Sequence, residues 1–219
     1  MRRPDAVIFD MDGVIFDSER LCLECWEQLA QEHGFVGMQK AFLKCTGTTV
    51  EETRRIMLEH FGEAFDYDGF ARQASVLFHK IEEEQGLPMK PGVVELLEML
   101  QKENIPVGLA SSTRLQTVER QLKAAGIYDF FQVVIGGDQL KKSKPEPDIY
   151  LMACKEMKVS PENAYAIEDS FNGIRSACAA GMKAIMVPDL VAPDEEMKEK
   201  STLIVTDLLQ LKEYLCNGF

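Results

Sequence analysis

Short apolar segments alternate along the chain with longer amphipathic segments. The apolar segments span three or four residues, are rich in Val, Ile and Ala, and are followed by polar residues, which is typical of buried strands. In the longer segments apolar residues recur at helical spacing, as Leu115, Val118 and Leu122 do. The pattern predicts strands at 6–9, 107–110, 132–135, 165–167 and 184–187, and helices beside them at 92–103, 114–125, 147–158 and 170–180.

Strands that alternate with helices of this length indicate an α/β fold, with a Rossmann-like parallel sheet covered on both faces. The long segment between the first two strands differs, because it predicts only helices, at 18–33, 36–44, 50–60 and 66–85. A stretch rich in Gly and Pro, 86–92, leads back to the sheet. We therefore expect a Rossmann-like catalytic core at 1–16 and 88–219, with a helical cap inserted at 17–87.

Composition and charge indicate a folded globular protein and argue against several kinds of binding partner. The 219 residues are 46% hydrophobic and 27% charged, as in ordinary folded proteins. The net charge of −12 argues against binding to nucleic acid or to an anionic membrane surface. No apolar run suits a membrane span, and the first residues lack the apolar stretch of a signal peptide, so we expect a cytoplasmic protein.

The six cysteines are spread along the chain, which favours reduced thiols over a disulfide framework. Cys22 and Cys25 form a C-x-x-C pair within a predicted helix, where positions three apart share one face. Packing in the core accounts for the pair. A zinc site would need a second close pair of ligands, which the sequence does not offer.

Polar side chains follow the first four predicted strands. In an open α/β sheet, ligands bind beyond the carboxyl ends of the strands, so these side chains are expected at one rim. The segments are Asp10-Met11-Asp12-Gly13, Ser111-Ser112-Thr113, Lys144-Pro145-Glu146-Pro147-Asp148 and Glu168-Asp169-Ser170.

Several carboxylates at one rim repel one another unless cations compensate them. Mg²⁺ prefers oxygen ligands and binds through one or two carboxylates together with substrate phosphate. Lys144 adds a further positive charge. The set of residues therefore predicts a site for Mg²⁺ and an anionic ligand, with a phosphoryl group as the obvious candidate.

Asp10 and Asp12 are two residues apart, so in an extended segment both carboxylates point the same way. One carboxylate can attack phosphorus and form an aspartyl-phosphate. The other can protonate the leaving oxygen and later accept a proton from water. Gly13 lets the chain turn sharply after them. A plain acidic turn is the alternative explanation for this motif.

The other segments also have simple structural explanations. Ser111, Ser112 and Thr113 precede a predicted helix, where Thr113 and Gln116 suit a capping box, although a helix start also suits a phosphate. Lys144 lies in a basic turn that is stiffened by the two prolines after it. Glu168 and Asp169 are also an ordinary pair of acids at the start of a helix.

Taken together and in order, these motifs resemble the haloacid dehalogenase superfamily of phosphotransferases. The motifs are Asp10-x-Asp12-Gly13-Val14, Ser111-Ser112, Lys144-Pro145-x-Pro147-Asp148 and Glu168-Asp169. The stretch from Phe9 to Glu19 is similar to the β-phosphoglucomutase-like branch, whose members carry a helical cap after the first strand. The resemblance spans residues 5–188.

The resemblance implies a role for each matching residue. Asp10 is implied as the nucleophile and a Mg²⁺ ligand, and Asp12 as the general acid/base and a Mg²⁺ ligand through its backbone carbonyl. Ser111 is implied to hold the phosphoryl group, with Ser112 beside it, and Lys144 to neutralise the nucleophile and the phosphoryl oxygens. Asp169 is implied as a Mg²⁺ ligand, with Glu168 as a direct or water-mediated helper.

The resemblance leaves a choice between phosphatase and sugar-phosphate mutase. The mutases carry a cap arginine three residues after a glycine, whereas this chain has Val50 after Gly47. Since a guanidinium is a preferred phosphate partner, its loss favours hydrolysis, although Arg54 or Arg55 could replace it. Gly47 and Thr48 are candidates for a cap loop that contacts substrate, or for a mere connection between helices.

We expect a Mg²⁺-dependent phosphatase of a small phosphorylated metabolite such as a sugar phosphate, acting as a monomer. A β-phosphoglucomutase-type mutase is the first alternative. Hydrolysis of pyrophosphate or of a nucleotide is a further alternative within the enzymes. A non-catalytic binding module on this fold is the alternative from another class, and the clustered acids and lysine argue against it.

Overall fold

The computed structural model describes residues 3–46, 48 and 50–217. Its contacts divide the chain into two compact units, Met1–Asp17 with Pro88–Phe219 and Ser18–Leu87. Each unit is described here by itself. No helix in the described part of the chain is both long enough and apolar enough to cross a membrane.

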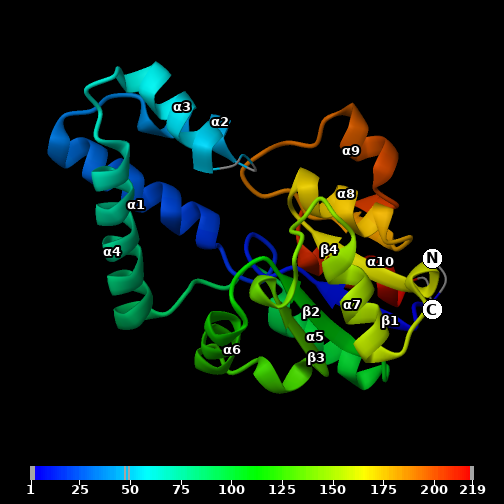
Figure 1. Ribbon diagram of the computed structural model, residues 1–219. Helices are drawn as coiled ribbons and strands as arrows, with labels where there is room; N and C mark the ends of the chain where they lie inside the picture. The colour runs from blue at the N-terminus through cyan, green and yellow to red at the C-terminus, as the bar shows by residue number, and fades with distance from the viewer. Residues whose placement is uncertain (1–2, 47, 49, 218–219) are drawn as a thin grey trace. The chain divides into compact units, whose positions relative to one another are not determined.

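The first unit is built on one parallel sheet (Figure 1). The described strands lie in the order β3-β2-β1-β4-β5-β6, and all of their pairings are parallel. The strands are β1 (Ala6–Phe9), β2 (Val107–Ser111), β3 (Val133–Gly136), β4 (Ala164–Glu168), β5 (Lys183–Met186) and β6 (Leu203–Ile204). The expected α/β class with a Rossmann-like parallel sheet is confirmed.

The helices of this unit follow the strands in sequence, as the periodicity predicts for α5 to α8. The sequence pattern did not predict α9, α10 or the strand β6, and of these α9, with six residues, and β6, with two, are short. The α-helices are α5 (Val93–Lys102), α6 (Leu115–Ala124), α7 (Asp148–Met157), α8 (Phe171–Ala179), α9 (Glu195–Lys200) and α10 (Leu208–Cys216). Short 3-10 helices are η1 (Tyr128–Phe130), η2 (Gly137–Gln139) and η3 (Pro161–Asn163).

Apolar side chains cover both faces of the sheet. On one face Ala6 and Ile8 of β1 join a buried cluster that includes Tyr150 of α7 and Ile174 of α8. The alternate residues of β1 are buried as well, and Phe9 meets the ring of Phe131 edge to face at 6.2 Å between centroids. Since side chains alternate across a strand, burial along all of β1 requires cover on both sides, as in doubly wound folds.

A compact loop follows β1 and brings the chain back to the sheet. Asp12 and Phe16 form a bridge, and the amide of Ile15 donates to the carbonyl of Met11. Phe16 also pairs in antiparallel fashion with Met89 of the returning chain. The loop therefore holds the two ends of the inserted segment together within the sheet unit.

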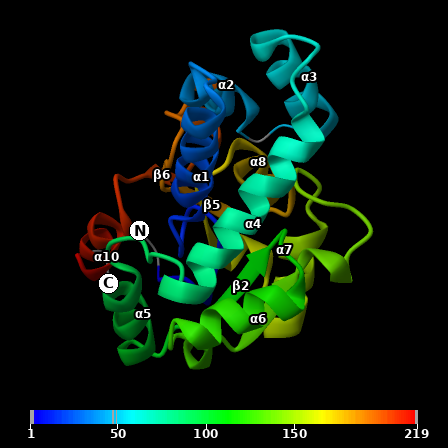
Figure 2. The ribbon, with the colours of Figure 1, turned by 90° about the vertical axis from the view of Figure 1, so that its left-hand side faces the viewer.

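The second unit is helical throughout its regular structure in the described residues (Figure 2). Its core is aromatic, with the Trp26 ring lying 5.2 Å from Phe70 and 6.0 Å from Phe42 between centroids. Helices α1 and α4 pack together, and so do α2 and α3. The bounds are α1 (Ser18–His33), α2 (Met38–Cys45), α3 (Val50–Phe61) and α4 (Tyr67–Gln85).

The six cysteines, all of them among the described residues, are free thiols. Cys22 and Cys25 both lie on α1, with Cys25 buried and Cys22 half-buried. Burial raises the pKa of Cys22 to about 12, and Glu19 adds to the rise. The burial of Cys25 fits packing within the helical unit.

Candidate active site

The carboxyl ends of the central strands deliver the candidate residues to one rim of the sheet. Asp10 directly follows β1, Ser111 ends β2, and Glu168 ends β4. Because β1 lies between β2 and β4, these three residues come from neighbouring strand ends. Lys144 reaches the same place from the loop between η2 and α7.

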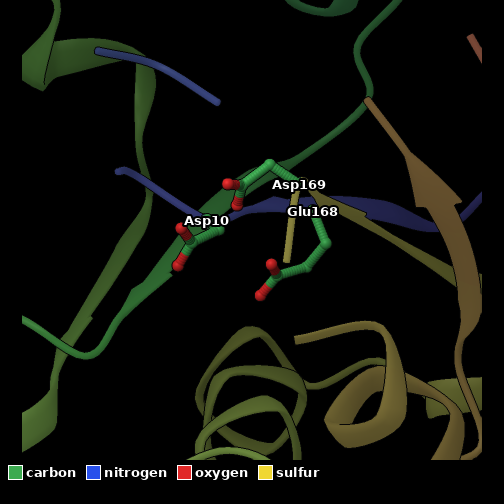
Figure 3. Close-up of side chains that lie close together, drawn as sticks. All are labelled: Asp10, Glu168 and Asp169. Atoms are coloured by element: carbon green, nitrogen blue, oxygen red, sulfur yellow. The ribbon is translucent and has the colours of Figure 1, made fainter. Parts of the chain in front are cut away.

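Three carboxylates come together at this rim. One oxygen from each of Asp10, Glu168 and Asp169 lies within 4.8 Å of the other two (Figure 3). Asp10 and Glu168 are buried, and Asp169 is half-buried. Hard oxygen donors at this separation suit a divalent cation.

Lys144 bridges two of the three carboxylates. Its Nζ donates to Asp10 Oδ1 at 2.5 Å and to Glu168 Oε1 at 2.6 Å, and it also donates to the carbonyl of Ala110 at 3.1 Å. Only 7% of the Lys144 side chain is exposed. With all three carboxylates ionised, the single ammonium leaves two negative charges uncompensated, which a divalent cation would balance.

Burial and the neighbouring charges together raise the pKa values of both Asp10 and Lys144. Burial raises the pKa of Asp10 to about 8, and nearby Glu168 and Asp12 add to the rise, while Lys144 opposes it. Burial acts to lower the pKa of Lys144, but Asp10 and Glu168 outweigh it and raise that pKa above its ordinary value. The lysine therefore stays charged, and the carboxylates require positive charge nearby.

Glu168 is fully buried and accepts hydrogen bonds on both oxygens. Oε1 accepts from Lys144 and from the Tyr150 hydroxyl at 2.6 Å, and Oε2 accepts from the Ser170 hydroxyl at 3.1 Å. Gly173 lies so close that a Cβ there would collide with the Glu168 carboxylate. This carboxylate is therefore fixed in place by its neighbours.

A residue in the loop after β2 makes a hydrogen bond to the Asp12 carboxylate. The Thr113 hydroxyl donates to Asp12 Oδ2 at 3.0 Å, and the Thr113 amide donates to Ser111 Oγ, also at 3.0 Å. The expected capping box of Thr113 with Gln116 is not formed. Helix α6 instead has Arg114 at its N-cap, and Asp138 accepts from the amide of Leu115 at 2.8 Å.

The remaining candidates are Ser112, Gly47 and Thr48. Ser112 is exposed beside buried Ser111. Gly47 lies outside the described residues. Thr48 belongs to the helical unit, where its hydroxyl bonds to the carbonyl of Cys45 at 2.7 Å and to the Thr53 hydroxyl at 2.9 Å. Contact of Gly47 and Thr48 with substrate stays a prediction.

Sequence reasoning missed Tyr150 and Ser170 as partners of Glu168. Ser170 is also the N-cap of α8 and accepts from the amide of Gly173 at 3.0 Å. Its place directly after two acids at a helix start was a usable signal. Tyr150 gave none, because a tyrosine among the apolar residues of α7 looks like any core residue.

Comparison with known proteins decides the family. The family model for haloacid dehalogenase-like hydrolases matches residues 7–187, which is most of the chain. The chain belongs to the haloacid dehalogenase-like hydrolases.

Individual relatives cover most of this haloacid dehalogenase-like chain. The phosphorylated carbohydrates phosphatase of Thermotoga maritima is 32% identical over 181 residues, 83% of each chain. The β-phosphoglucomutase of Bacillus subtilis is 34% identical over 189 residues, 83% of this chain and 82% of its own length. The crystal structure of CbbY from Rhodobacter sphaeroides with phosphate has a TM-score of 0.72 at 28% identity and covers 95% of this chain and 96% of that one. The resemblance seen in the motifs is confirmed, and the chain is a phosphoric monoester hydrolase of this family.

Proposed function

We propose that this chain is a Mg²⁺-dependent phosphatase that cleaves a small phosphate monoester through an aspartyl-phosphate on Asp10. The observation that supports it best is the position of Asp10, which is paired with Lys144 and lies beside the carboxylates of Glu168 and Asp169. A phosphorylated carbohydrate is the substrate class that we favour, because the Thermotoga maritima relative is named for it.

The residues at the rim fit a divalent cation. Asp10 and Asp169 would hold Mg²⁺, with the backbone carbonyl of Asp12, while Glu168 would support it through the network around its buried carboxylate. When bound, Mg²⁺ supplies positive charge that screens the carboxylates from an incoming phosphoryl group.

The phosphoryl group would be held from the loop after β2 and by Lys144. Ser111 Oγ accepts from the amide of Thr113, which leaves the hydroxyl hydrogen of Ser111 to be donated to a phosphoryl oxygen. The N-terminus of α6 follows at once and favours negative charge. Lys144 adds positive charge, and Ser112 lies next to Ser111 at the exposed end of the loop.

The first chemical step transfers the phosphoryl group to Asp10. A carboxylate oxygen of Asp10 forms a bond to phosphorus as the bond from phosphorus to the ester oxygen breaks. The electron pair of the broken bond stays on the ester oxygen, which takes a proton from Asp12 and leaves as a neutral alcohol.

The second step returns the enzyme to its starting state. The Asp12 carboxylate takes a proton from a water molecule as the water oxygen attacks phosphorus. The bond between phosphorus and Asp10 breaks, its electron pair restores the Asp10 carboxylate, and inorganic phosphate is released. Asp12 thus acts as acid in one step and as base in the next.

The arginines of α3, which could replace the missing cap arginine of the mutases, are paired with carboxylates in this structure. A mutase must hold a second phosphate, and Arg54 and Arg55 were the candidates to do so. Arg54 is bound to both carboxylate oxygens of Asp68, at 2.6 and 2.7 Å, and Arg55 is paired with Glu52 and Glu59. Each guanidinium already has its carboxylate partners within the helical unit.

A panel of small phosphate esters tests the function. We expect phosphate release that requires Mg²⁺ and stops with EDTA, and from β-glucose 1-phosphate we expect free phosphate rather than glucose 6-phosphate. Formation of glucose 6-phosphate without phosphate release would make the chain a mutase. Absence of turnover on every ester, with Mg²⁺ bound normally, would instead support a binding module.

Gly13 is expected to be essential for the cation site. Its φ of +79° is strained for other residues, and a Cβ there would collide with Asp169 Oδ2. Gly13→Ala is therefore expected to displace the Asp169 carboxylate and weaken Mg²⁺ binding by about tenfold or more, as measured by titration calorimetry.

Gly181→Ala is the matched control for Gly13→Ala. Gly181 has a φ of +82°, but a Cβ there would meet nothing within 4 Å. The control variant shares the backbone strain, which costs about 1–2 kcal/mol, and should bind Mg²⁺ normally. Equal loss of Mg²⁺ affinity in both variants would contradict the contact between Gly13 and Asp169 as the cause.

A further inference from the structure

The side chain of Asp12 is oriented by a residue from a different strand end. Thr113 follows β2 by two residues, and its hydroxyl donates to Asp12 Oδ2 at 3.0 Å. The terminal torsion of an aspartate is broad, so the backbone alone does not set the plane of its carboxylate. The hydrogen bond from Thr113 restricts that plane.

Thr113 is itself held by hydrogen bonds on both sides of its peptide. Its amide donates to Ser111 Oγ at 3.0 Å, and its carbonyl accepts from the amide of Gly137 at 2.8 Å. Two residues after Thr113, the amide of Leu115 donates to Asp138 Oδ1 at 2.8 Å. The loop after β3 therefore anchors the loop that carries Thr113.

Two glycines allow these loops to approach so closely. A Cβ at Gly136 would collide with the backbone of Leu115, and a Cβ at Gly137 would collide with the carbonyl of Ser112. Both glycines have ordinary negative φ values, so the need for glycine is one of space alone. The backbone of Thr113, which carries the hydroxyl, is thus held by the Ser111 side chain on one side and by the backbone of Gly137 on the other.

We propose that Thr113 is a positioning residue for proton transfer by Asp12. This inference rests on the proposed function, in which Asp12 protonates the ester oxygen as the bond to phosphorus breaks. Thr113 touches neither the phosphorus nor the leaving group in this account, and it acts only by orienting the acid. A capping role does not explain its hydroxyl, because the N-cap of α6 is Arg114.

The leaving group separates this role from a merely structural one. An alkyl phosphate releases a basic oxygen that must take the proton of Asp12 as the bond breaks. p-Nitrophenyl phosphate releases a phenolate that is stable without that proton. Loss of acid orientation therefore slows cleavage of the alkyl ester and spares cleavage of the aryl ester, whereas a damaged site slows both.

The test compares kcat/KM for p-nitrophenyl phosphate and for the best alkyl phosphate of the panel. This quantity reports the steps up to phosphoryl transfer, so later hydrolysis of the aspartyl-phosphate does not affect it. Thr113→Val removes the hydroxyl and keeps the shape of the side chain. We expect it to lower kcat/KM for the alkyl ester about 10- to 100-fold and kcat/KM for the aryl ester by less than about threefold. Thr113→Ser keeps the hydroxyl and is expected to restore the alkyl value to within about threefold.

Asp12→Asn gives the reference for this pattern. It should lower kcat/KM for the alkyl ester more than kcat/KM for the aryl ester. Adding Thr113→Val to Asp12→Asn should cause no further loss of kcat/KM for the alkyl ester, because there is no acid left to orient. Thermal unfolding of each variant checks that the fold is intact.

Two results would overturn the inference: an equal loss for both esters in Thr113→Val, or a further loss of alkyl activity when it is added to Asp12→Asn. A different result bears on the proposed function instead. If Asp12→Asn itself slows both esters equally, proton transfer by Asp12 is wrong, whatever Thr113 does.

Discussion

Asp10→Asn is expected to lower kcat for phosphate release by at least about 10³-fold, because an amide cannot attack phosphorus as a carboxylate does. The change keeps the size of the side chain at the end of β1, so the sheet should form as before. It also removes one acidic group from a buried cluster that holds three carboxyl groups and one lysine. Stability should therefore be kept or increased while activity is lost.

Asp5→Asn is the control for this prediction. Asp5 immediately precedes β1 and is exposed, so the same chemical change there removes a charge far from the rim. We expect activity within about twofold of the unchanged protein. Rates measured with Mg²⁺ on the best ester of the panel decide the comparison, and full activity in Asp10→Asn would exclude Asp10 as the nucleophile.

Lys144→Met is expected to damage both stability and activity. It leaves the buried carboxylates of Asp10 and Glu168 without their shared cation, and breaking a buried ion pair from one side costs about 3–5 kcal/mol. Phosphoryl transfer should also fall by at least about 10²-fold, since the positive charge beside the developing negative charge is gone. Urea unfolding with EDTA present measures the loss of stability.

Two further variants separate the causes of this loss. Lys142→Met breaks an exposed pair with Glu146, at 3.4 Å, and should cost less than about 1 kcal/mol. Adding Glu168→Gln to Lys144→Met removes one uncompensated charge and should recover part of the stability without recovering activity. A loss of stability in Lys144→Met no larger than that in Lys142→Met would contradict the role of the buried network.

The fold followed from the sequence because local pattern and global arrangement agree. The apolar segments at 6–9 and 107–110 predicted β1 and β2 almost residue for residue. Parallel strands must end at one rim, so the polar residues after them could be placed together without coordinates. Edge elements such as β6, with two residues, carry too little pattern to be predicted.

The contacts within the rim could not be predicted in the same way. Thr113 meets Asp12 across 101 positions of sequence, and Tyr150 meets Glu168 from the buried side of α7. Arg54 pairs with Asp68, fourteen positions further along the chain, and its sequence position gave no sign of that partner. Such partners depend on how elements pack, which residue spacing alone does not encode.

Trapping of the phosphoryl group on the enzyme tests the central claim most directly. The protein is mixed with Mg²⁺ and p-nitrophenyl phosphate, quenched in acid within milliseconds, digested, and examined by mass spectrometry. The account predicts one phosphorylated peptide, modified at Asp10 and absent from Asp10→Asn. Turnover with the phosphoryl group found on another residue, or turnover that persists in Asp10→Asn, would contradict it.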